Sequence, residues 1–207
     1  MRYFLYSALA CVLFQCKSDY NALIPAAMDG SCASQRMPKL ATSSLYQASI
    51  DVTGHHLSGL LVIKAMSDST WRVVFTNEAG VTFVDLGLGL DGSFKVHHAI
   101  RQLNRKPVLT TLRKDFALMI GLPFQRAQLS QFATGDEVYF GARQKNESYY
   151  FITGKDCAYL HRMERGSDRK RVVSISLPGS AYPTPSQLVL QHHTFDMQIK
   201  LNRIERE

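Results

Sequence analysis

The sequence lacks the short motifs that usually point to a metal site or an enzyme. It contains no His-Glu-x-x-His and no Cys-x-x-Cys, the spacings that hold zinc. The glycine-rich stretch 86–92 lacks the Lys-Ser or Lys-Thr pair of a phosphate-binding loop, and no Gly-x-Ser-x-Gly turn presents a nucleophilic serine. Adjacent histidines occur at 55–56, 97–98 and 192–193, but neighbouring side chains of a strand point to opposite faces and cannot share one ion. We therefore expect no catalytic residue, no metal and no cofactor, and a protein that is not an enzyme.

Charged residues are also few. They make up 20% of the chain against 45% apolar residues, a composition typical of a globular protein, and 207 residues suit one domain of ordinary size. The formal net charge of +7 favours anionic partners such as phospholipid head groups, lipopolysaccharide or nucleic acid, but a basic surface that only keeps the protein soluble has the same sign. Because no motif interleaves aromatic and basic residues, we expect no nucleic-acid partner.

The N-terminus is apolar, but the apolar stretch is shorter than the roughly 20 residues of a membrane-spanning helix. Arg2 followed by about a dozen apolar residues is the pattern of a secretory signal. The chain turns polar directly after Cys16, and this junction resembles the lipobox of bacterial lipoproteins. Leu13 stands three positions before the cysteine, whereas Gln15 departs from the usual small residue. The resemblance implies that residues 1–16 are a lipoprotein signal peptide, and that acylated Cys16 anchors the protein to a membrane of the bacterial cell envelope, by expectation the outer membrane. An ordinary cleaved secretion signal, or an apolar N-terminus on a cytosolic protein, is the alternative.

Residues 17–43 are rich in small polar residues and show no sustained period, which predicts a flexible tether. Cys32 lies in this segment, and Cys157 lies in the body of the chain. Because the envelope outside the cytoplasm is oxidising, a disulfide between them is one interpretation, and two unrelated thiols are the other.

Residues 44–207 are interpreted as a single β-rich domain. Alternation with period two predicts a series of strands, and the short links between the first four indicate an antiparallel meander. The predicted strands are 45–52, 57–64, 71–76, 81–86, 137–142, 148–153, 158–163, 170–177, 187–193 and 197–204. Apolar residues at spacings of three and four predict an amphipathic helix over 108–120, and 99–103 has similar spacing. The fold class is therefore mainly β (α+β), a curved antiparallel sheet or half-open barrel of about ten strands with one main amphipathic helix.

Two of the early strands, 57–64 and 71–76, are substantially apolar on both faces, so both faces need apolar cover. One cover is the helix, and the other is either more core or a hollow of the size of a lipid. The strand residues that would line such a cavity, and the helix residues that would form its lid, are Leu61, Ile63, Trp71, Val73, Phe75 and Phe83, and Leu112 and Phe116.

A curved antiparallel sheet with an internal helix, on an exported chain of this size, resembles the fold of the lipoprotein-localisation carrier and its outer-membrane receptor. The stretches Leu57–Lys64 and Arg72–Thr76, with Gly80, Asp85 and Asp115-Phe116, also resemble a group of uncharacterised lipoproteins from Bacteroidetes-type bacteria. The resemblance covers residues 44–204 and implies an apolar cavity that accepts acyl chains. It carries over no individual binding residue.

Basic residues cluster at one predicted hairpin tip, where Arg165, Arg169, Lys170 and Arg171 surround Gly166-Ser167-Asp168. They form either a solvated end of the hairpin or a contact for anionic head groups beside the membrane.

Together, these patterns predict a membrane-anchored envelope lipoprotein that binds a lipid, a lipoprotein acyl chain or another hydrophobic ligand without catalysis. The alternative is a structural or assembly subunit of an envelope complex, which would meet a protein partner through sheet edges or the basic hairpin.

Overall fold

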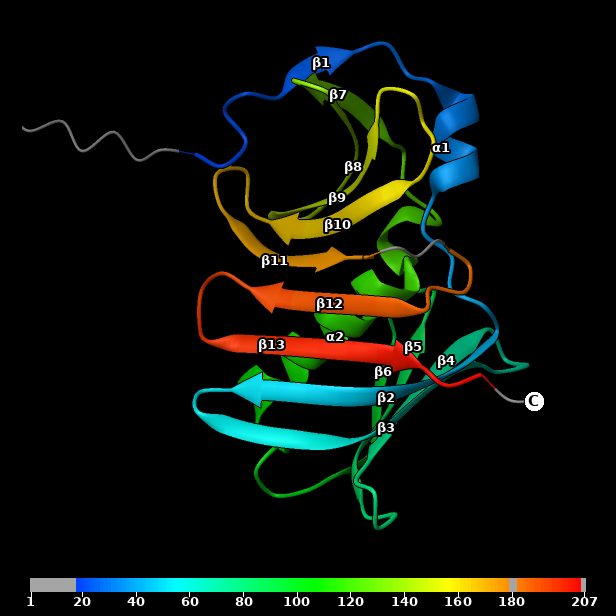
Figure 1. Cartoon of the computed structure of the whole chain (residues 1–207), viewed down its shortest axis with the longest axis vertical. Helices are drawn as coiled ribbons and strands as arrows, with labels where there is room; N and C mark the ends of the chain where they lie inside the picture. The colour runs from blue at the N-terminus through cyan, green and yellow to red at the C-terminus, as the bar shows by residue number, and fades with distance from the viewer. Residues whose placement is uncertain (1–17, 179–181, 206–207) are drawn as a thin grey trace, which may run out of the picture.

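The computed structural model describes residues 18–178 and 182–205. In this part of the chain thirteen strands form one antiparallel sheet, in the order β1-β7-β8-β9-β10-β11-β12-β13-β2-β3-β4-β5-β6. The strands are β1 (Ile24–Ala26), β2 (Ser43–Val52), β3 (His55–Ala65), β4 (Thr70–Thr76), β5 (Thr82–Gly89), β6 (Phe94–Ala99), β7 (Ser130–Thr134), β8 (Glu137–Gln144), β9 (Glu147–Gly154), β10 (Leu160–Gly166), β11 (Arg171–Ser176), β12 (Gln187–His192) and β13 (Met197–Arg203). The helices are α1 (Gly30–Arg36), α2 (Lys106–Ile120) and the 3-10 turn η1 (Leu122–Phe124). The predicted fold class, a mainly β chain with a curved, half-open antiparallel sheet, is confirmed (Figure 1).

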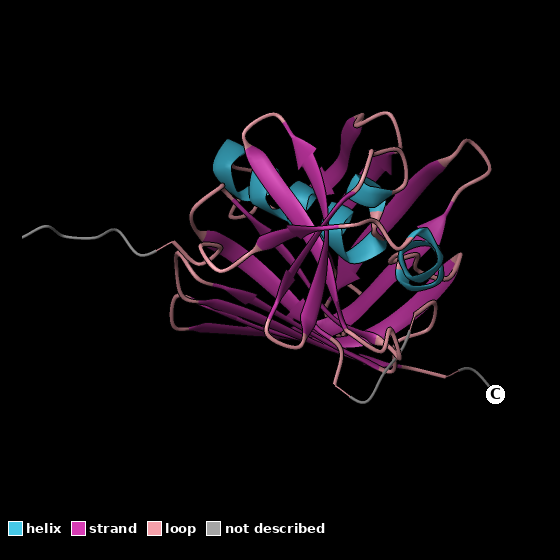
Figure 2. Cartoon of the chain, turned by 90° about the horizontal axis from the view of Figure 1, so that it is seen from above, coloured by secondary structure: helices cyan, strands magenta, loops and turns pink. Residues whose placement is uncertain are grey.

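The sheet consists of two meanders, β2–β6 and β7–β13, that meet where the last strand pairs with β2. In this pairing Leu201 lies opposite Ala48, and Met197 lies opposite Val52. Helix α2 joins β6, at one edge of the sheet, to β7, which lies beside β1 at the other edge. A connection between opposite edges has to cross a face of the sheet, and α2 lies across the concave face (Figures 1 and 2).

The core forms on this concave face because each strand places alternate side chains there. In β13, Met197, Ile199 and Leu201 are buried, whereas Lys200 and Asn202 are exposed. The same alternation in the other strands adds side chains that are at most 1% exposed, such as Tyr46, Ile63, Val73 and Leu190.

Local sequence explains where α2 begins and ends. Pro107 suits the first turn, which needs no backbone N–H donor at that position. Gly121 ends the helix with φ of 85°, and a Cβ atom at this residue would lie 2.0 Å from the carbonyl oxygen of Pro38. Both the left-handed backbone and the close approach therefore require glycine. The predicted helix over 108–120 is found, two residues longer at its start.

The flexible tether predicted for residues 17–43 is wrong for most of that segment. Strand β1 pairs with β7, α1 follows it, and Leu40 is 2% exposed in the core. Each element is too short for a sequence period to be visible, and each is held by contacts with residues more than a hundred positions away. The structure therefore replaces the tether by a segment that is part of the fold.

Besides β1, two further strands near the sheet edges, β6 and β7, were not predicted from the sequence. In β6, Lys95, Val96, His97 and His98 are all exposed, so this strand has no alternating apolar face. The helical spacing read at 99–103 corresponds instead to the end of β6 and the turn after it.

Candidate functional site

An apolar pocket of about 320 Å³ lies between the concave face of the sheet and the first half of α2. Its floor comes from β2–β5 and β13, and its roof comes from α2 and the turn before it. The lining is Ala48, Ile50, Val52, Leu57, Leu61, Phe75, Val84, Leu103, Pro107, Val108, Thr111, Leu112, Phe116, Phe195, Met197, Ile199 and Leu201. Thr111 supplies the one polar side chain of this lining, so the pocket suits a hydrocarbon group.

The pocket exists because the two halves of α2 pack differently. Leu118, Met119 and Ile120 are fully buried at the C-terminal end. In the first half, Pro107 is exposed and Leu112 is only half-buried, so this half stands away from the sheet. Ala48, a small residue, lies in the floor below it.

Four of the residues proposed for a cavity line this pocket: Leu61 and Phe75 from the strands, and Leu112 and Phe116 from the helix. The others lie on or beside the same core without lining it. Ile63, Trp71 and Val73 are buried among core residues, and the ring of Phe83 packs 5.3 Å from that of Phe75. That any of them contacts a ligand stays a prediction.

From the sequence, no β13 residue was assigned to the cavity. Met197, Ile199 and Leu201 alternate clearly in the sequence, but only their pairing with β2 brings them to the pocket. Phe195, in the turn before β13, lies at the rim and is 40% exposed. In the sequence, a phenylalanine within an otherwise polar predicted turn was the signal that could have indicated a role for Phe195.

A buried ionic cluster fixes α2 to the sheet beside the pocket. Asp115 Oδ1 accepts a hydrogen bond from Arg165 Nη2 at 3.0 Å, and Asp115 Oδ2 lies 2.8 Å from His192 Nε2. All three residues are at most 4% exposed. In the sequence, Asp115 lies in the apolar stripe of the helix, three residues after Leu112. A carboxylate on the buried side of a helix needs a buried partner, so this position was the signal for the cluster.

Glu147 extends this cluster toward the surface. Its Oε1 accepts hydrogen bonds from Arg165 Nη1 and Lys114 Nζ, both at 3.0 Å. Burial by itself would raise the pKa of Glu147, but Lys114 and Arg165 outweigh it and hold the pKa below its ordinary value. The carboxylate therefore stays ionised and joins β9 to α2 and β10.

This cluster corrects the prediction for the basic hairpin. Arg165 is buried and cannot contact head groups, because its side chain points to the concave face. Arg171 pairs with Glu164 at 3.0 Å, whereas Arg169 and Lys170 are exposed at the β10–β11 turn. The four residues therefore do not form one surface.

Cys32 and Cys157 form a disulfide that joins α1 to the loop after β9. Their Cα atoms are 5.9 Å apart across a separation of 125 residues. The bond holds the N-terminal segment against the small end of the sheet, formed by β7–β10.

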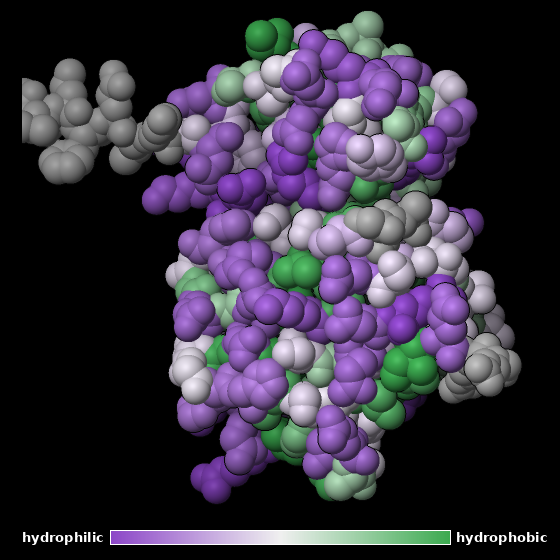
Figure 3. Space-filling model, viewed as in Figure 1, coloured by the Kyte–Doolittle hydropathy of each residue, from purple (hydrophilic) through white to green (hydrophobic). Residues whose placement is uncertain are grey.

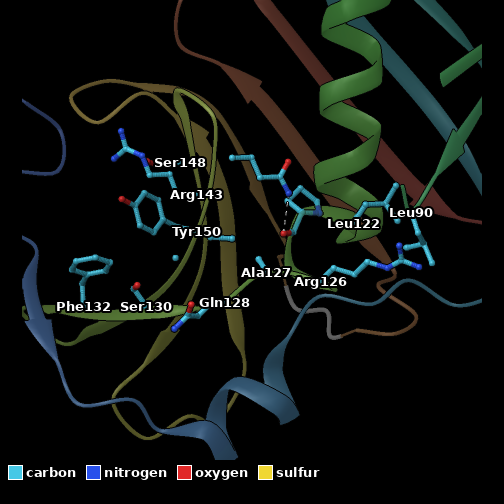
Figure 4. A pocket seen from close by; sticks show the side chains of 14 residues that line it. Leu90, Leu122, Arg126, Ala127, Gln128, Ser130, Phe132, Arg143, Ser148 and Tyr150 are labelled. Carbon is cyan, nitrogen blue, oxygen red and sulfur yellow. Dashed lines mark hydrogen bonds between the residues drawn. The ribbon is translucent and has the colours of Figure 1, made fainter. Parts of the chain in front are cut away.

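A second hollow, of about 520 Å³, lies between β7–β9 and the turn after α2 (Figure 4). Arg126 and Arg143 line opposite ends of it and do not converge on one point. Arg143 is paired with Asp168 at 2.8 Å, so this hollow presents no concentrated charge for a ligand.

The convex face of the sheet is mostly hydrophilic, with small and scattered apolar patches (Figure 3). The apolar pocket lies on the other, concave side of the sheet. Cys16, the predicted anchor, lies outside the described residues. In residues 18–178 and 182–205, no helix has the length and apolar character needed to cross a membrane.

The sequence matches no family model and no curated protein. Among solved structures, a LolA superfamily protein from Nitrosomonas europaea is similar over 88% of this chain and 95% of that chain, with a TM-score of 0.55 and 7% identity. A DUF1329 family protein from Desulfovibrio piger matches over 80% of this chain and 85% of that chain, with a TM-score of 0.43 and 9% identity. The first of these likenesses shows that the chain has a LolA-like fold.

Proposed function

We propose that this protein is a non-catalytic, membrane-anchored lipoprotein of the bacterial envelope that holds a lipid or acyl chain beneath α2. The observation that carries the proposal is the apolar pocket of about 320 Å³ with its rim at Phe195. The LolA-like fold supports it, because a curved sheet around a helix provides the space for such a pocket.

The physics of the pocket favours a hydrocarbon chain over a polar ligand. Burying apolar surface contributes about 25 cal/mol per Å², and a chain brings no polar group that would lose its hydrogen bonds to water. The volume lies near the lower end of the range for small-molecule sites, roughly 300–1,000 Å³, so the pocket suits one chain rather than several.

The binding experiment uses N-phenyl-1-naphthylamine, an uncharged fluorescent probe, with the purified chain freed of detergent. The probe should bind and be displaced by lipids extracted from the producing cells. Thr111→Trp places a large ring in the pocket and should weaken probe binding at least about tenfold. Thr110→Trp, one residue away on the exposed side of α2, is the matched control and should bind as the unmodified chain does.

Absence of probe binding, or equal binding by both tryptophan variants, would contradict the proposal. Mass spectrometry of an organic extract of the purified chain adds an independent measurement. Co-purifying lipid supports the carrier, whereas a reproducible protein partner without lipid would favour the envelope-subunit alternative.

The anchor is a separate part of the proposal. Acyl groups on Cys16 would hold the chain on a membrane, because each buried methylene contributes about 0.8 kcal/mol and two or three chains make attachment essentially permanent. Labelling with radioactive palmitate should be lost in Cys16→Ala. Labelling that persists in this variant would refute the anchor.

A further inference from the structure

We infer that one end of the molecule docks on the lipid bilayer, so that the pocket opens toward the head groups. This end, here called the mouth end, carries the β2–β3 turn (53–54), the β10–β11 turn (167–170) and the β12–β13 turn (193–196). The inference rests on the proposed anchor at Cys16 and adds the orientation of the protein on the membrane.

The three turns share an end because the strands between them alternate in direction. Each antiparallel strand reverses the chain, so the turns that follow β2, β10 and β12 lie together, on the left in Figure 1. The pocket reaches this end. Its lining includes Val52 and Leu57 beside the first turn, and Phe195 within the third.

The described chain enters the fold at the same end. The backbone N–H of Asp19 donates to the carbonyl oxygen of Arg169 at 2.8 Å, and Asp19 Oδ2 accepts from the backbone N–H of Arg171 at 2.8 Å. Tyr20 follows and is 9% exposed, in a cluster with Tyr139 and Tyr150. The chain is therefore held at the β10–β11 turn from residue 19 onward.

This attachment limits how far the mouth end can lie from an anchor. Asp19 lies three positions after Cys16, and a fully extended chain spans at most about 10 Å over that length. A sulfur that carries acyl chains would then place the β10–β11 turn at the level of the head groups. A flexible tether over residues 17–43 would have left the orientation free.

The surface of the mouth end suits a bilayer. Phe195 is 40% exposed at the pocket rim, with its ring centroid 4.3 Å from that of His192. Exposed aromatic rings are favourable at the boundary between head groups and hydrocarbon. A lipid chain could pass from the membrane to the pocket beside this ring.

Basic residues lie next to the pocket on its helix side. Arg101, Arg105 and Lys106 are exposed and flank the lining residues Leu103 and Pro107. Within residues 18–178 and 182–205 none of the three forms an ion pair. They are available to lipid phosphate groups, for which each basic residue near the surface contributes roughly 1 kcal/mol.

Arg169 and Lys170 add two exposed cations at the β10–β11 turn, but acidic residues lie at the same end. Asp19 and Asp196 are exposed there, and Asp51 pairs with His56 at 2.6 Å. The net charge of the mouth end is therefore small. The inferred orientation rests instead on where the chain enters the fold and on where the pocket reaches the surface.

The test measures which end approaches the bilayer. The acylated full chain is placed in vesicles of phosphatidylethanolamine and phosphatidylglycerol, with an environment-sensitive nitrobenzoxadiazole label on one introduced cysteine. Phe195→Cys and Lys170→Cys report on the mouth end. Lys64→Cys, on the exposed face of β3 at the opposite end, is the control, because Lys64 lies opposite Ser43 at the start of β2.

A nitroxide carried by the lipids should quench the two mouth-end labels at least about threefold more than the label at residue 64. Two mouth-end sites guard against a folding defect in either variant. Equal quenching at both ends, or stronger quenching at residue 64, overturns the orientation while the anchor stands. A wild-type chain that carries no acyl group and does not float with the vesicles overturns the anchor and the orientation together.

Discussion

Asp115 is an acidic side chain that is 1% exposed in the apolar stripe of α2, held by Arg165 and His192. Removing its charge takes one of two carboxylate partners from the buried guanidinium of Arg165, which keeps Glu147, and the loss of one buried hydrogen-bond partner costs about 1–3 kcal/mol. We expect Asp115→Asn to lower the free energy of unfolding by that amount in urea titrations at neutral pH.

The matched control is Asp168→Asn, which removes a carboxylate from an exposed pair with Arg143. Exposed pairs contribute about 0–1 kcal/mol, so this variant should unfold near the wild-type midpoint. If the two variants are equally stable, the buried cluster does not hold α2 in place.

Glu137 links stability to pH. The hydrogen bond from Arg162 holds the pKa of Glu137 below its ordinary value of 4.5. A carboxyl group that is more acidic in the folded chain stabilises the fold above the unfolded pKa, and this contribution is lost as pH falls through the folded value. The stability difference between wild type and Glu137→Gln should therefore shrink as unfolding is measured from pH 7 down to pH 3.

Asp136 provides the comparison, because it neighbours Glu137 but its side chain is fully exposed. Asp136→Asn keeps the pair between Glu137 and Arg162, so the pH dependence that this pair contributes should remain. A constant difference between Glu137→Gln and wild type at every pH would show that the carboxylate is not coupled to folding.

Among the elements, the segment with β1 and α1 depends on contacts made far along the chain. The Cys32–Cys157 disulfide closes a loop of 125 residues in sequence. Such a cross-link stabilises by about 2–5 kcal/mol, largely by restricting the unfolded chain. We expect Cys32→Ala with Cys157→Ala to lower the free energy of unfolding by this amount and to make α1 sensitive to limited proteolysis.

Reductant is the internal control for this prediction. It should lower the stability of the wild type toward that of the double variant and leave the double variant unchanged. A double variant as stable as the oxidised wild type would show that β1 pairing and Leu40 suffice to hold the segment.

For helix α2, the sequence predicts the type of element and its ends but not its distance from the sheet. Its apolar spacing, Pro107 and Gly121 indicate its type and its ends, since these are local properties of the backbone. The separation between its first half and the sheet depends on which strands lie below it. The pocket is therefore a property of the assembled fold and not of the helix.

For the whole molecule, a ligand in the pocket should stabilise the folded chain. A ligand that binds only the folded state at a hundred times its dissociation constant adds about 2.7 kcal/mol. Scanning calorimetry with a saturating single-chain lipid should raise the melting temperature of wild type and of Thr110→Trp, but not of Thr111→Trp. An equal rise in all three would place the ligand outside the pocket.

The sequence alone determined the fold class, because period-two alternation and helical spacing are local patterns. Runs such as Leu57–Lys64 and Met197–Arg203 indicated their strands directly. Exposed edge strands such as β6 lack that alternation and gave no signal. Four lining residues, Leu61, Phe75, Leu112 and Phe116, were predictable for the same reason, because the early strands needed apolar cover on both faces.

Tertiary structure decided what lies next to what. The pairing of β13 with β2 completed the pocket, and burial of Arg165 against Asp115 removed it from the basic hairpin. The attachment of Asp19 at the β10–β11 turn replaced a tether with a defined point of entry. These contacts join residues that are at least 50 positions apart, and no local pattern encodes such pairings because they depend on how the whole sheet curves around α2.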